Sequence, residues 1–302
     1  MSTLMASPLS QGRFQKAIGE SGGAFYSGGL DYEPREVREQ EDLKFVQDAF
    51  GTPKLADLRK LSAQDLLNGV AARTSDEHIE FGPDVDGWFL PDTVPNIYAA
   101  GKQAHIPLLA GWNANEDRAD PQLTAESFKR QAQAEFGADA DEFLKLYTAS
   151  SDAEALRSAD DLASDHFIAY STWRWLEAQA KTGEAPAYRY HFELAAPVDK
   201  FHPAGSGAFH SDDIEYVFGT LDSREGAEWR PEDRILSDQI QQYWTNFARA
   251  GDPNGDSLPK WPAYNTADGW QVMHLGATSE ARPDTQRDRY LFLDKVWGKP
   301  GS

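Results

Sequence analysis

Three short stretches carry side chains that could perform nucleophilic or acid–base chemistry. The first, "AIGESGGAF", contains a G-x-S-x-G pattern at residues 19–23, which is typical of a turn that presents a nucleophilic serine. Such a turn needs a helix directly after the serine, so that backbone N–H groups face the developing oxyanion. The residues after Ser21, "GGAFYSGGLDYEP", contain four glycines and a proline, which disfavour a helix. We therefore predict that Ser21 is a turn residue at the end of a strand and is not a nucleophile.

The second stretch, "PLLAGWNANED", presents a carboxylate after an apolar run. Residues 106–112 are typical of a parallel strand that is buried on both faces. In open α/β sheets, functional groups lie beyond the carboxyl ends of such strands. Glu116 at this position could orient an imidazole through its Nδ1–H and stabilise the imidazolium. The alternative is a solvated acidic loop, because most carboxylates face water.

The third stretch, "GSGAFHSDDIEYVFG", holds a candidate base, His210. Small residues at 205–208 let the backbone pass close to a site, and residues 211–213 could cap a short helix over 214–218. A loop histidine directly before a helix is free to point into a cleft. The other histidines lie in predicted strands or helices or beside proline turns: His78, His105, His166, His191, His202 and His274.

Strands and helices alternate along the chain, which predicts an α/β fold with a mainly parallel sheet. Strands are expected at 14–21, 106–112, 187–194 and 270–276, and helices within 34–73 and 124–182 and at 95–100, 232–250 and 283–296. Trp88, Phe89 and Trp112 are expected in the core. About four strands are few for 302 residues, so the sheet is expected to be half of a larger one. Residues 2–6 resemble the last turns of a helix without a capping sequence, and we expect the fold to begin upstream of Met1.

Composition narrows the classes of function. The 29 basic and 49 acidic residues give a net charge of −20, which makes nucleic acid a poor partner. The absence of cysteine excludes disulfides, zinc-thiolate sites and thiol catalysis. No apolar run approaches the roughly 20 residues of a transmembrane helix, and the N-terminus does not resemble a signal peptide. We expect a soluble protein, either cytoplasmic or secreted/periplasmic. "DPNGD" at 252–256 begins like a calcium loop but lacks its later glycine and glutamate, so a turn is expected.

Five motifs in order carry a resemblance that covers nearly the whole chain: "LMASPLSQGRFQKAIGESG", "GPDVDGWFLPD", "IPLLAGWNANED", "GAFHSDDIEYVFG" and "FARAGDPNG…LPKWPAY". Together they resemble the C-terminal three-fifths of a type-B carboxylesterase, the α/β-hydrolase family that includes para-nitrobenzyl esterases and cholinesterases. The resemblance implies that residues 1–302 form the C-terminal part of a single α/β-hydrolase domain. The nucleophile and the oxyanion loop would then lie upstream of residue 1.

The chemistry that the resemblance implies is hydrolysis of a small-molecule carboxylic ester by a Ser-His-Glu triad through an acyl-enzyme. Glu116 matches the family's acid and His210 its base, in the chain order of the fold. Phe167 lies in a helical aromatic group whose default role is core packing; the resemblance offers the alternative that it lines the acyl pocket. No cofactor or metal is needed. This chain alone is expected to be weakly active or inactive. Two alternatives stay open: a non-catalytic, cholinesterase-like binding or adhesion protein, and one chain of a split esterase completed by an N-terminal chain.

Overall fold

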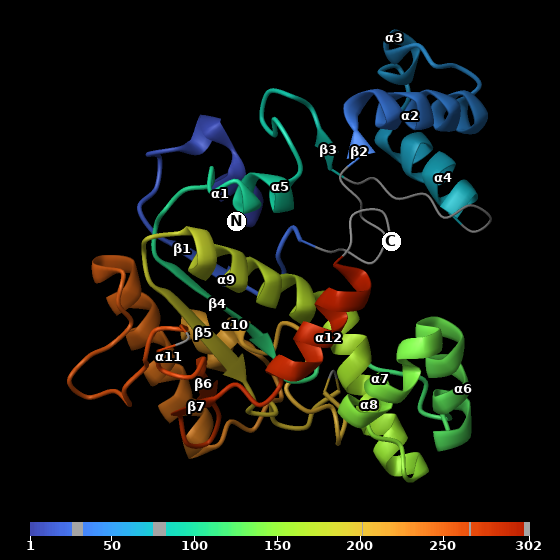
Figure 1. Ribbon diagram of the computed structural model, residues 1–302. Helices are drawn as coiled ribbons and strands as arrows, with labels where there is room; N and C mark the ends of the chain where they lie inside the picture. The colour runs from blue at the N-terminus through green and yellow to red at the C-terminus, as the bar shows by residue number, and fades with distance from the viewer. Residues whose placement is uncertain (26–32, 75–82, 201, 266, 299–302) are drawn as a thin grey trace.

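A five-stranded sheet forms the centre of the computed structural model, which describes residues 1–25, 33–74, 83–200, 202–265 and 267–298. The strand order is β1-β4-β5-β6-β7, and the first four strands run parallel while β7 is antiparallel to β6 (Figure 1). The strands are β1 (Ala17–Glu20), β4 (Leu108–Asn113), β5 (Ala187–Phe192), β6 (Gln271–Leu275) and β7 (Glu280–Pro283). The predicted mainly parallel sheet is confirmed. Strand β7 was not predicted, because its sequence, "EARP", is short, polar and largely exposed.

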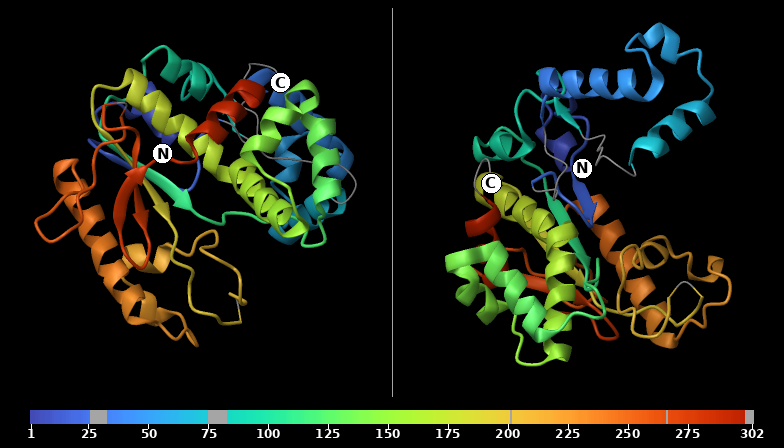
Figure 2. Two further views of the ribbon diagram at one scale, coloured as in Figure 1. Left: turned by 60° about the horizontal axis from the view of Figure 1, so that its bottom comes forward. Right: turned by 90° about the vertical axis from the view of Figure 1, so that its right-hand side faces the viewer.

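Helices cover both faces of this sheet (Figure 2). Strands β4 and β5 are buried at every position, as the apolar run in β4 predicted. One face packs against α1 (Ser2–Ala6), α5 (Val94–Ala99), α9 (Tyr170–Thr182) and α12 (Arg287–Trp297), and the other against α10 (Ile214–Phe218) and α11 (Pro231–Ala250). The result is a three-layer α/β architecture with a separate apolar core on each side of the sheet.

The remaining helices form two groups. Helices α6 (Ala125–Phe136), α7 (Ala140–Leu146) and α8 (Asp152–Ser164) pack together, and α8 continues into α9 through a π-helical turn, η3 (Asp165–Ala169). Helices α2 (Arg35–Phe50), α3 (Leu55–Leu58) and α4 (Ala63–Thr74), with the short parallel pair β2 (Glu33–Pro34) and β3 (Asp84–Val85), stand away from the sheet (Figure 1). The 3₁₀ turns are η1 (Pro8–Ser10), η2 (Gly137–Asp139) and η4 (Leu221–Ser223).

The sequence of helix α11 explains where this helix begins, which face it buries and where it ends. Pro231 occupies the first turn, where its missing N–H has no intrahelical partner to lose. The apolar side chains then recur at spacings of three and four, so one stripe is buried against the sheet: Leu236, Ile240, Tyr243 and Phe247. The helix ends at Gly251, which adopts the left-handed conformation with φ of 76°.

The expectation that Trp88 lies in the core is wrong, since its side chain is 72% exposed, whereas Trp112 is 1% exposed. The local backbone explains the difference. Asp86 Oδ1 accepts hydrogen bonds from the backbone N–H groups of residues 88–90, which fixes a turn that presents Trp88 to solvent. Among the described residues, no helix is both long and apolar enough to cross a membrane.

Candidate active site

The side chains of Glu116 and His210 meet beyond the carboxyl end of β4. Glu116 Oε2 lies 2.5 Å from His210 Nδ1, although the two residues are 94 positions apart in the chain. The glutamate side chain is fully buried, while the imidazole is 35% exposed. Within the described part of the chain, this is the one hydrogen bond of the His210 ring. The carboxylate therefore orients the ring and leaves Nε2 available for proton transfer.

The second oxygen of Glu116 is held from two strands. Oε1 accepts hydrogen bonds from the backbone N–H of Asn113 and from the hydroxyl of Ser21, each at 2.6 Å. Asn113 ends β4 and Ser21 follows β1, which is the parallel neighbour of β4. A buried carboxylate is tolerated only when it is hydrogen-bonded. These contacts therefore fix the position of the Glu116 carboxylate.

Ser21 lies at a strand end, as the sequence predicted. Its φ is 49° and its N–H donates to Gly111 O at 2.9 Å, which closes the turn after β1. Residues 22–25 are not helical, and the N–H groups of Gly22 and Gly23 donate to the hydroxyls of Thr172 and Ser171 on α9. The contact of Ser21 with Glu116 was not predicted. No local sequence pattern indicates it, because it depends on the pairing of β1 with β4, which brings both strand ends to one edge.

The loop that carries His210 is paired with the loop that carries Glu116. The N–H of Asn115 donates to Ala208 O at 2.9 Å, and the N–H of Ala208 donates to Asn115 Oδ1 at 3.1 Å. Gly207, with φ of 66°, is required here because a Cβ atom would lie 1.9 Å from Asn115 Oδ1. The small residues expected to permit a close backbone approach do so against Asn115.

Asp212 and Asp213 do not cap α10, contrary to the sequence-based expectation. The helix begins after Asp213 without a side-chain cap. Asp212 Oδ2 instead accepts the backbone N–H of Phe209 at 2.9 Å. Asp213 Oδ1 lies 3.2 Å from Asn113 Nδ2, and the same amide group donates to Phe209 O at 2.7 Å. Both aspartates therefore support the backbone next to His210, because they face inward and not toward the helix N-terminus.

Replacing Asp213 by asparagine is expected to stabilise the fold at pH 7. Burial raises the pKa of Asp213 to about 6, and the neighbouring Glu20 and Glu116 carboxylates add to this shift. The native state then binds more protons than the unfolded state between about pH 4 and 6, so the free energy of unfolding falls as pH rises through that window. Asparagine can keep the hydrogen bonds and removes the buried charge, so we expect a gain of about 2 kcal/mol at pH 7.

Urea unfolding at pH 4, 5, 6 and 7 measures this effect. The advantage of Asp213→Asn should grow from pH 4 to 6 and then level off. Burial also raises the pKa of Asp212 to about 6, so the variant should retain part of the pH dependence. Asp256→Asn, at an exposed position, is the matched control and should follow the wild type. A pH-independent difference between Asp213→Asn and the wild type would contradict the prediction.

An aromatic ring flanks the imidazole. The π-helical turn η3 directs Phe167 against His210, with ring centroids 5.2 Å apart and ring planes at 73°. Phe167 is 46% exposed, so its ring forms an apolar wall beside an imidazole that solvent can reach. π-helical turns occur frequently at functional sites. At this exposure Phe167 is not a core residue, and its contact with the imidazole was not predicted.

Comparison with known proteins identifies the family. The model of the Carboxylesterase family matches residues 1–293. The chain belongs to the carboxylesterase family. Among its relatives, Carboxylesterase 5A of Canis lupus familiaris is 30% identical over 305 residues, covering 91% of this chain and 51% of that protein. Carboxylesterase 4A of Bos taurus is 26% identical, covering 98% of this chain and 58% of that protein.

The chain is also similar to a solved esterase structure and to neuroligin-2. A solved structure of PNB esterase aligns with a TM-score of 0.73 at 26% identity, covering 96% of this chain and 60% of that one. This member of the carboxylesterase family therefore has the α/β-hydrolase fold, as the resemblance implied. Neuroligin-2 of Rattus norvegicus is also 26% identical, over 96% of this chain and 39% of its own length. The chain spans little more than half the length of the carboxylesterases named above.

Proposed function

We propose that this chain supplies the acid and the base of a serine carboxylesterase. Glu116 is the acid and His210 the base of a Ser-His-Glu triad that hydrolyses a small-molecule carboxylic ester. One observation carries the proposal: the 2.5 Å contact between the buried Glu116 carboxylate and Nδ1 of a half-exposed imidazole. Family membership supports ester hydrolysis in general.

In the proposed reaction, the serine hydroxyl attacks the ester carbonyl while His210 Nε2 accepts its proton. The imidazolium that forms is stabilised by Glu116 through the Nδ1–H hydrogen bond. The same proton then passes to the leaving alcohol, and an acyl-enzyme remains. Water, deprotonated by His210, attacks the acyl group; His210 then returns this proton to the serine oxygen as the carboxylic acid leaves, which restores the serine.

The nucleophile in this proposal is a serine outside residues 1–302, either upstream in the same polypeptide or on a complementary N-terminal chain. Two observations support this. The Ser21 hydroxyl is engaged with Glu116 and not with His210, and no described hydroxyl is hydrogen-bonded to the His210 ring. The chain also spans only 51% to 58% of the length of the carboxylesterases compared above. Residues 1–302 would then be the C-terminal part of one α/β-hydrolase domain.

A non-catalytic binding protein is the competing function. Family membership alone does not separate the two, since neuroligin-2, whose name is not that of an esterase, matches at 26% identity. A protein that only binds a partner has no need of an oriented imidazole backed by a buried carboxylate. The Glu116–His210 pair therefore favours the enzyme.

The test is to read the coding frame upstream of residue 1 for a G-x-S-x-G sequence and to assay the longer product with para-nitrophenyl acetate. The longer protein, or the complex with a co-purifying chain, should hydrolyse the ester, whereas the 302-residue chain should not exceed buffer. Robust hydrolysis by the 302-residue chain that is lost in Ser21→Ala would overturn the placement of the serine. If neither the upstream coding frame nor a co-purifying chain contains such a serine, the proposed esterase function is wrong.

Ser21→Ala distinguishes a positioning role from a nucleophilic one. Because the hydroxyl donates one of three hydrogen bonds that Glu116 receives, its removal should lower kcat of the complete esterase about 10- to 100-fold, not about 10⁶-fold. Ser21→Gly is the matched variant, since glycine tolerates the positive φ and also lacks the hydroxyl. Equal losses in both variants would assign the effect to the hydroxyl. Full activity in both would contradict it.

A further inference from the structure

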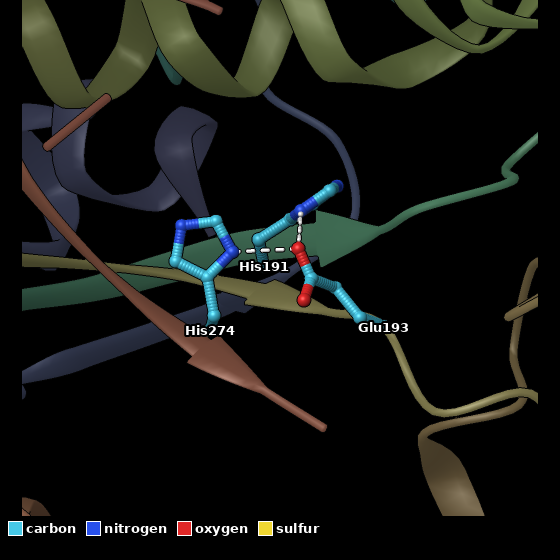
Figure 3. Close-up of side chains that lie close together, drawn as sticks. All are labelled: His191, Glu193 and His274. Atoms are coloured by element: carbon cyan, nitrogen blue, oxygen red, sulfur yellow. Dashed lines mark hydrogen bonds and ion pairs between the residues drawn. The ribbon is translucent and has the colours of Figure 1, made fainter. Parts of the chain in front are cut away.

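A second cluster of side chains lies where β5 and β6 meet. His191 is in β5, Glu193 follows that strand, and His274 is the cross-strand partner of His191 in β6. Residues 191 and 193 point to the same face because side chains alternate along a strand. Figure 3 shows both imidazoles directed at the carboxylate of Glu193. The register of two parallel strands thus brings two imidazoles and one carboxylate together.

The three side chains are close enough to share one metal ion. Glu193 Oε1 lies 3.1 Å from His191 Nδ1 and 2.6 Å from His274 Nδ1. One ligand atom from each of the three residues lies within 4.8 Å of the others. We propose that His191, Glu193 and His274 form a binding site for a divalent transition-metal ion, with Zn²⁺ the preferred ion.

The donor types favour zinc. Two imidazole nitrogens and one carboxylate oxygen form a set that binds Zn²⁺ with three protein ligands and leaves a coordination position open. Bond lengths of about 2.1 Å in a tetrahedral site separate ligand atoms by about 3.4 Å. The observed N···O distances would therefore open by a few tenths of an ångström to just under one ångström, which rotation of the Glu193 side chain can supply. Binding of a metal through Nδ1 requires the proton of each neutral imidazole to be on Nε2.

Burial and charge around the cluster are compatible with binding. The side chains of His191 and His274 are 9% and 13% exposed, while Glu193 is 32% exposed and gives solvent a route to the site. Arg282 is a competing cation, with its Nη2 3.6 Å from Glu193 Oε2. That side chain is 48% exposed and contacts the other oxygen, so Oε1 stays directed at the imidazoles.

Bound metal would join β5 to β6 across a long stretch of chain. The segment between Glu193 and His274 contains the loop of His210. A cross-link that closes such a segment lowers the entropy of the unfolded chain and so stabilises the native state. The inference does not depend on the proposed esterase activity, because its measurement is metal binding.

Isothermal titration calorimetry of the chelator-treated 302-residue chain with Zn²⁺ tests the site. We expect one equivalent to bind, and the midpoint of thermal unfolding to rise by about 5 °C when free zinc is 100 times the Kd. His274→Gln and Glu193→Gln should each weaken binding by about ten-fold or more. His105→Gln, at an exposed histidine that contacts the Gly101 carbonyl, is the matched control and should bind like the wild type. His210→Gln should also retain binding, which separates this site from the Glu116–His210 pair.

Circular dichroism establishes that each variant is folded before titration. If His274→Gln fails to fold, Glu193→Gln decides, because its side chain is partly exposed and its amide keeps the shape of the carboxylate. Co²⁺ gives an independent signature: the intense visible absorption of a four-coordinate ion should appear in the wild type and be lost in Glu193→Gln. Absence of binding by the wild type, or equal affinity in the wild type and both variants, would overturn the proposal.

Discussion

In the complete esterase that we propose, replacing His210 by glutamine is expected to lower kcat for para-nitrophenyl acetate by about 10⁶. Glutamine can occupy the space beside Glu116, but its amide cannot accept the serine proton as Nε2 does. In the proposed reaction the imidazole also donates the proton to the leaving alcohol, so both half-reactions would lose the same group. KM should change little, because the ring acts on the transition state and not on substrate binding.

The measurement is steady-state hydrolysis, followed by an active-site titration that shows whether any acyl-enzyme accumulates. His105→Gln controls for the loss of a histidine outside the site and should retain wild-type kcat. If kcat of His210→Gln falls by less than ten-fold, the assignment of His210 as the base is wrong, and so is the proposed triad.

Replacing Glu116 by glutamine should lower kcat by about 10⁴. The amide oxygen of the new side chain can still accept the hydrogen bonds of Asn113 and Ser21, so its NH₂ group would face His210 Nδ1. An NH₂ group there requires Nδ1 to be the acceptor, which moves the ring proton to Nε2. The nitrogen that should accept the serine proton is then blocked, although the geometry of the site is preserved.

Glu126→Gln is the control for this substitution, because the Glu126 side chain is 86% exposed on α6. The double variant Glu116→Gln/His210→Gln should be no slower than His210→Gln alone, since the glutamate acts only through the imidazole. Multiplicative losses in the double variant would indicate that Glu116 has an independent role and would contradict the triad.

The sequence predicted those elements whose apolar patterns are long. Their positions agree with the prediction to within a few residues. The examples are the buried strands β4 and β5 and helix α11, whose apolar residues recur at regular helical spacing. Strand β7 has no apolar pattern, because it lies at the sheet edge and pairs mainly through its backbone. Trp88 shows that an aromatic residue is not by itself a core signal when an Asx turn fixes its backbone.

The candidate site was predicted in part. Chain order and family resemblance indicated Glu116 and His210, but their meeting depends on the hydrogen-bonded pairing of two loops around Asn115. The supporting hydroxyl of Ser21 follows from which strands are neighbours, and sheet order cannot be read from local patterns. For the same reason, the cluster of His191, Glu193 and His274 could not be predicted from the sequence. Each histidine alone resembles a strand residue, and only the register of β5 with β6 joins them.

The position of the Phe167 ring beside His210 depends on the number of residues in the π-helical turn at Asp165–Ala169. Such a turn holds one more residue than the regular helix it interrupts. Deleting one residue would remove the turn and join α8 to α9 as a continuous α-helix, which would displace the side chains of the turn itself. The Phe167 ring would then swing off the imidazole without any change of amino-acid type. A homologue with one residue fewer between these two helices should therefore present a different side chain to the imidazole.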